Sequence, residues 1–146
     1  MRLKRRRTRA ITCETCDAGP NDNAMSFEDW LTPELETLSW DMGQHMPYYD
    51  RAGLVISFAE SMWLSHVDPH YALVRHTHYP TGGMVSTAHL FFNHCWEPGH
   101  SPLIFETMVF QVDGWEDYQA RYTTEAEALV GHEATVARIK AGENPE

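Results

Sequence analysis

The hydrophobic positions of this chain are densest between residues 84 and 112. Two apolar runs rich in β-branched and aromatic side chains stand on either side of the polar segment CWEPGHSP at 95–102. Such runs, separated by a loop that contains Pro and Gly, are typical of adjacent antiparallel strands. The pattern predicts two neighbouring central strands, at 84–94 and 103–112.

Weaker strand patterns flank this pair. Residues 71–79 (YALVRHTHY) predict a strand joined to the first central strand by a turn at 80–83, and a further short strand is expected at 118–122. Residues 48–56 predict a separate small hairpin that turns at 51–53.

Three helices are expected from their start signals. Thr-Pro-Glu at 32–34 begins a helix that ends near Gly43, since Pro loses nothing at the first helical position and Glu favours the positive end of the helix dipole. Ser-x-x-Glu at 57–60 and Thr-x-x-Glu at 124–127 are capping boxes, and the second opens a helix to about Lys140.

These elements together predict the α+β class. We expect an antiparallel meander of three to four strands with helices packed on one face and the C-terminal helix against the sheet. Both central strands are apolar on both faces, so the second face needs either the N-terminal helices or a second subunit. We expect the N-terminal helices to cover it.

Charge divides the chain at residue 24. Residues 1–24 carry six basic and three acidic side chains, and the rest of the 146-residue chain carries five basic and eighteen acidic ones. We expect 1–24 to be a basic, disordered tail, or untranslated upstream sequence if Met25 is the true start, and 25–146 to form a single domain. An acidic body repels nucleic acid, so nucleic-acid binding is expected only through the tail.

The sequence also bears on location. No apolar run approaches the ~20 residues needed to span a bilayer, and the basic start lacks the apolar core of a secretory signal. Three cysteines, an odd number, fit reduced thiols. We therefore expect a cytoplasmic protein without a membrane partner.

One set of residues is a candidate for chemistry. His94 ends the first central strand, Glu106 lies inside its neighbour, and His132 is on the core side of the last helix. If the three converge, they would form a ligand set for zinc with an open water position, or Glu106 would act as a base. The alternative is a structural His–Glu hydrogen-bond network. No other cofactor is expected.

Two further residue pairs and two tryptophans have alternative roles. His76 and His78 point to one face of a strand and are either a chelating pair or ordinary exposed residues. Cys-x-x-Cys at 13–16 is half of a zinc site without its other two ligands. Trp96 and Trp115, in loops at strand ends, are either anchors for a protein partner or lids on the core.

Three segments resemble a known family. VSTAHL with NH (85–90 and 93–94), PLIFETMVF (102–110) and RYTTEAEALVGHEATVAR (121–138) are similar to small proteins encoded by actinobacterial phages and prophages. The family usually has a Gly-containing segment where this chain has LFFN at 90–93. No activity, substrate or cofactor is known for the family, so the resemblance implies a phage origin.

Two functions follow as expectations. The first is a phage-derived, non-enzymatic accessory protein that acts by protein–protein contact, with inhibition of a host or defence protein as one version. Its partner and its oligomeric state are not specified by the sequence. The second is a small metal-dependent enzyme that uses His94, Glu106 and His132.

Overall fold

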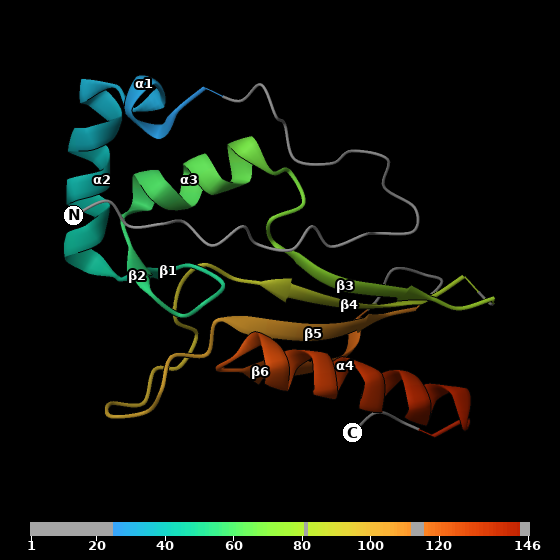
Figure 1. Ribbon diagram of the computed structural model, residues 1–146. Coiled ribbons are helices and arrows are strands. Elements are labelled where there is room, and N and C mark those ends of the chain that lie inside the picture. Colours follow the sequence, from blue (N-terminus) through green and yellow to red (C-terminus); the bar gives the residue numbers. More distant parts are fainter. Residues whose placement is uncertain (1–24, 81, 112–115, 144–146) are drawn as a thin grey trace.

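The computed structural model describes residues 25–80, 82–111 and 116–143 (Figure 1). The predictions for the tail at 1–24, for the cysteine pair at 13–16 and for Trp115 lie outside these residues. Within them, no helix is both long and apolar enough to cross a membrane.

The predicted α+β class is confirmed. A four-stranded antiparallel sheet has the strand order β3-β4-β5-β6, and a separate two-stranded hairpin is formed by β1 and β2. The strands span Tyr48–Tyr49 (β1), Val55–Ile56 (β2), Leu73–His78 (β3), Met84–His89 (β4), Phe105–Phe110 (β5) and Glu116–Tyr122 (β6).

The two most apolar strands are neighbours, as predicted. Pairing of β4 with β5 runs from Met84 opposite Phe110 to His89 opposite Phe105. The first central strand is shorter than expected, because it ends at His89 and not at residue 94. Phe91 adopts φ +65°, in the left-handed region that non-Gly residues rarely occupy, and this turns the chain out of the strand.

Helix α4 (Glu125–Lys140) covers one face of the sheet. Its predicted capping box is present, with the Thr124 side chain accepting from the Glu127 N–H and the Glu127 carboxylate accepting from the Thr124 N–H. Val136 packs against Val85 and Val109 in a buried cluster beneath the helix. A second buried cluster joins Ala128 of the helix to Phe105 and two neighbouring residues.

The remaining helices form a group at the β1–β2 hairpin. They span Phe27–Trp30 (α1), Pro33–His45 (α2) and Phe58–Val67 (α3). Their main contacts are with one another and, through α3, with β1. Our expectation that they cover the second face of the four-stranded sheet is therefore wrong, because the hairpin takes up their apolar side chains instead. The Tyr48 ring, for example, lies 5.3 Å from that of Phe58.

Candidate functional site

His132 lies in the core between α4 and the sheet. It is fully buried, and its two ring nitrogens each lie 2.8 Å from a threonine hydroxyl, Nε2 from Thr77 and Nδ1 from Thr87. Thr87 in turn bonds Thr107 across the central strands at 2.7 Å. Burial lowers the pKa of His132 to about 4, so the ring is neutral near pH 7. Both nitrogens are already occupied by hydroxyls, which makes this histidine part of a structural network.

Glu106 lies on the opposite face of the sheet, although it directly precedes Thr107 in β5. Successive side chains of a strand alternate between faces, and the register pairs Glu106 with Arg121 of β6. One carboxylate oxygen, Oε2, accepts from Arg121 Nε at 2.8 Å and from Gln119 Nε2 at 2.7 Å. Glu106 is therefore an ion-paired residue within the sheet.

His94 follows β4 on a segment that is bonded to the residues just before β5. Its backbone N–H donates to the Leu103 carbonyl at 3.0 Å, and its ring stacks on Phe92 with centroids 4.4 Å apart. Burial lowers its pKa, Arg121 lowers it further, and Glu106 opposes both. Its buried Nε2 has no hydrogen-bond partner among the residues that the structure describes.

The three predicted site residues do not converge. His94 is influenced by Glu106 and Arg121, whereas His132 is bonded to threonines that face α4. Within the described ranges, no group of three or more His, Cys, Asp or Glu side chains is arranged to hold a metal ion. The expected shared ligand set is wrong because β5 sends Glu106 to one side of the sheet and leaves His132 on the other.

A third buried histidine, His89, was not selected from the sequence. It is 2% exposed, and among the described residues neither ring nitrogen makes a hydrogen bond of good geometry, although the Asp50 backbone lies close enough to act on the ring. Its ring packs against Phe91 and Phe105, with centroids 4.6 and 5.1 Å away. Burial lowers its pKa to about 4, the nearby Arg51 cation adds to the shift, and the Asp50 backbone partly opposes it. In the structure the buried positions of β4 alternate, and His89 continues the series of Val85 and Thr87, but the sequence does not mark it because Thr87 and His89 are polar.

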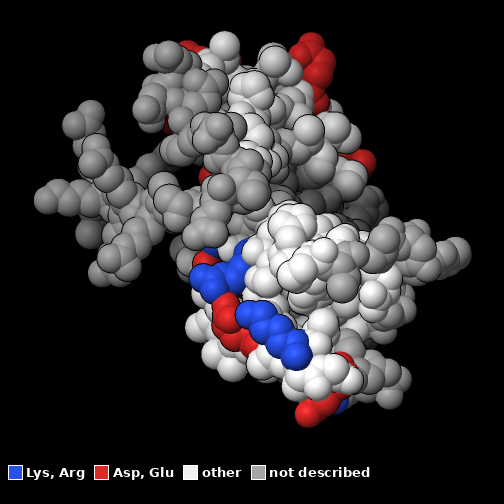
Figure 2. Space-filling view, turned by 90° about the vertical axis from the view of Figure 1, so that its right-hand side faces the viewer, with Lys and Arg blue, Asp and Glu red and all other residues white. Residues whose placement is uncertain are grey.

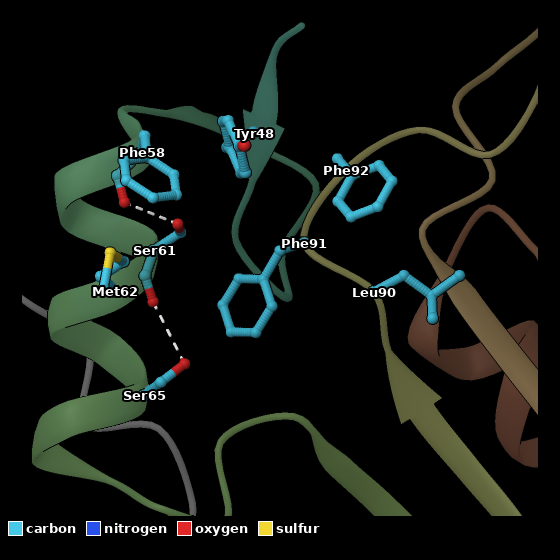
Figure 3. A pocket seen from close by; sticks show the side chains of 8 residues that line it. All are labelled: Tyr48, Phe58, Ser61, Met62, Ser65, Leu90, Phe91 and Phe92. Atoms are coloured by element: carbon cyan, nitrogen blue, oxygen red, sulfur yellow. Dashed lines mark hydrogen bonds between the residues drawn. The ribbon is translucent and has the colours of Figure 1, made fainter. Parts of the chain in front are cut away.

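A shallow hollow of about 390 Å³ separates α3 from the segment after β4 (Figure 3). Tyr48 and Phe58 lie on one side, and Phe91 extends toward the helix. Its two serine hydroxyls are already used, because Ser61 donates to the Phe58 carbonyl at 2.7 Å and Ser65 donates to the Ser61 carbonyl at 3.2 Å. The described residues that line it carry no charged group, and most of its surface is apolar.

Charge on the described surface is unevenly placed. Helices α1 and α2 carry five exposed carboxylates, and the chain has no Lys or Arg between residues 25 and 50. Figure 2 shows Lys and Arg only in its lower half, where α4 and the sheet lie, beside acidic atoms. We use the name acidic surface for the exposed carboxylates of these two helices: Glu28, Asp29, Glu34, Glu36 and Asp41.

Two tryptophans are unusually exposed. Trp96, predicted as a partner anchor, is 83% exposed in the loop between β4 and β5, and Trp40, on α2, is 69% exposed. Trp96 is therefore not a lid on the core. Trp40 was missed from the sequence, because the apolar spacing of its helix did not show which side would be buried.

Comparison with known proteins gives no relative, since no family model, no curated protein and no solved structure matches the chain.

Proposed function

We propose that this protein is a non-enzymatic accessory protein that acts by binding a basic partner protein through the acidic surface. Isolated carboxylates on a surface serve mainly solubility. Several carboxylates without cations between them also produce a negative electrostatic field, which steers a partner of opposite charge and raises its rate of association. Five carboxylates with no intervening cation produce such a field over α1 and α2.

The observation that carries this proposal is the position of Trp40 within that field. Glu36 precedes Trp40 by one helical turn and so lies beside it on the same side of α2, while Asp41 follows Trp40 directly and lies about 100° further round the helix. Tryptophan is enriched among the residues that dominate binding energy, and a large aromatic side chain ringed by polar groups is the usual arrangement at an interface centre. Its 69% exposure leaves most of the ring available.

Trp96 is the second proposed anchor. Its loop also holds Glu97, which lies 3.2 Å from His100. The Glu97 carboxylate is exposed, so the loop adds a negative charge next to an exposed aromatic side chain. The phage resemblance makes a host or defence protein the natural partner class within this proposal.

Photo-crosslinking tests the proposal. A benzophenone amino acid placed at position 40, 96 or 130 in separate full-length proteins is irradiated in lysate of an actinobacterial host. Val130 on α4 is 72% exposed and provides the matched control, because it lies outside the acidic surface. We expect a discrete adduct from position 40 and none from position 130, with the yield falling as salt is raised to about 0.5 M.

A charge reversal separates specific from general capture. Glu36→Lys should reduce the adduct at position 40 at least tenfold, whereas Glu133→Lys on α4 should leave it unchanged. Equal adducts from positions 40 and 130, or an adduct insensitive to Glu36→Lys, would overturn the proposed surface.

A further inference from the structure

The edge strand β3 has an unpaired side that is centred on two histidines. In an antiparallel pair, successive residues alternate between bonding the neighbour and facing away. Tyr79 donates its N–H to the Gly83 carbonyl of the adjoining strand at 2.8 Å. By alternation Thr77 also faces β4, so His76 and His78 direct their backbone N–H and C=O groups to the open edge. In the part of the chain that the structure describes, no strand pairs with that edge.

This open edge is limited at both ends. A register shift between Leu73 and Arg75 marks a bulge at its start, and Pro80 follows its other end. Bulges and prolines are the devices that stop edge strands from pairing with other chains. The stretch between them, residues 75–79, contains no proline, no lysine and no acidic residue, and its midpoint is Thr77.

A second copy of β3 fits this stretch in one two-fold arrangement. Antiparallel pairing that uses all five residues is symmetric about Thr77, and it sets His76 of one copy opposite His78 of the other. Because the backbone groups of both histidines face the open edge, His76 of one copy and His78 of the other would form a hydrogen-bonded pair. The two copies would thus form one continuous eight-stranded sheet.

The same arrangement gathers four imidazoles on one face. Both histidines are exposed and lie on the side of the sheet opposite α4, since Thr77 between them bonds His132 beneath the helix. Their ring centroids are 6.2 Å apart within one chain. Two imidazoles that share an ion at a tetrahedral angle have centroids roughly 5.2 Å apart, given a metal–nitrogen bond of ~2.1 Å, so the two exposed rings must turn toward one another by about 1 Å to bind it together. Opposite residues across the strands have Cβ atoms only about 5 Å apart.

We infer that two copies of this chain pair along β3 and bind one zinc-class transition-metal ion between His76 and His78 of each copy. Imidazole nitrogens suit zinc and its neighbours in the first transition series, and four of them complete a tetrahedral shell. One chain supplies only two ligands, so the site is incomplete without the second copy. The ion also offsets the repulsion between two chains that each carry a net charge of −10.

Sedimentation of the tag-free, full-length protein with zinc chloride or with EDTA tests this inference. We expect a monomer in EDTA and a dimer with one zinc per two chains when zinc is added. Cobalt should replace zinc and show the intense visible absorption of a tetrahedral site. His76→Asn and His78→Asn should each abolish the zinc-dependent dimer while leaving the thermal midpoint of the EDTA-treated protein unchanged, because both side chains are exposed.

Two control variants exclude other metal ligands. His100→Asn removes an exposed histidine from the loop after β4. The double variant Cys13→Ser, Cys16→Ser removes the cysteine pair. Both proteins should still dimerise when zinc is added. A zinc-bound monomer, a dimer that persists in EDTA, or zinc-dependent dimerisation that survives His78→Asn would each overturn the site.

Discussion

The guanidinium of Arg51 and the carboxylate of Glu125 form two parallel hydrogen bonds. Nε donates to Oε2 at 2.8 Å and Nη2 donates to Oε1 at 2.5 Å, between residues 74 apart in the chain. The pair joins the turn of the β1–β2 hairpin to the first turn of α4. The Arg51 side chain is only 13% exposed, so the pair connects the two halves of the fold in a partly dry environment.

Replacing Arg51 with Lys should therefore destabilise the protein. A lysine supplies a point charge but cannot form the bidentate pair, so we expect a loss of about 1–3 kcal/mol in the free energy of unfolding. Arg75→Lys is the matched control, because the Arg75–Glu133 pair has side chains 50% and 58% exposed and should change stability by less than about 1 kcal/mol. Urea unfolding measures both. Equal losses from the two variants would contradict a structural role for the Arg51 pair.

Stability should fall as the solution becomes mildly acidic. His89 and His132 have folded-state pKa values of about 4, below the ordinary value of 6.5, because both are buried. Their contribution is complete above pH 6.5, and it is lost as pH falls from 6.5 toward 4, since only the unfolded chain then binds the two protons. Each shift corresponds to about 3 kcal/mol.

Unfolding free energies measured at about pH 7, 6 and 5 check this expectation. Near pH 5, the loss of unfolding free energy per pH unit should approach the value expected when the unfolded chain binds two more protons than the folded chain. His100→Asn, which removes an exposed histidine, should not alter the slope, whereas His132→Gln should lower it by about one proton. A stability that is flat between pH 7 and 5 would show that the two rings are already protonated or not buried.

Gly131→Ala should be costly although alanine is the better helix former. A Cβ at residue 131 would lie 2.1 Å from the Tyr122 hydroxyl oxygen and 2.6 Å from a ring carbon of the same residue, so the tyrosine must move. We expect a loss of about 1–3 kcal/mol. Gly43→Ala on α2, where the added Cβ meets nothing within 4 Å, should raise stability by up to about 1 kcal/mol. Thermal unfolding of the two variants would show opposite shifts, and shifts of the same sign would argue against the close approach of Tyr122.

Glu106→Gln should lower the free energy of unfolding. The substitution keeps the shape of the side chain but removes the charge that holds Arg121 and Gln119, and we expect a loss of about 1–2 kcal/mol. Glu97→Gln, on an exposed loop carboxylate, should be near neutral. If Glu106→Gln left the unfolding free energy unchanged, the ion pair would not be structural.

Local signals in the sequence specified most of the elements. Both capping boxes, Ser57 with Glu60 and Thr124 with Glu127, start helices where they were expected. The two central strands pair as their composition predicted, and the hairpin turns at residues 51–53. These features depend on neighbours within a few positions, which is why pattern and propensity suffice to find them.

The candidate site was harder, because it depends on which face each strand turns to the helix. The sequence groups Glu106 with His132 by their expected places in the elements. Successive side chains of a strand point to opposite faces, however, so Glu106 lies on one face while Thr107 beside it lies on the face of His132. The end of β4 at His89 depends on the backbone of Phe91, which no pattern marks, since phenylalanine rarely has a positive φ. The sequence predicts that the chain becomes helical from Ser26, and α1 begins there with Ser26 as its N-cap.

Polar side chains on both sides of β5 have a further effect during folding. Thr107 belongs with His132 under α4, and Glu106 belongs with Arg121 on the other face. A slip of this strand by one position would place the carboxylate beneath the helix and turn the Phe105 ring outward. Both displacements disfavour the shifted pairing, so the native register is specified by polar contacts as well as by apolar burial.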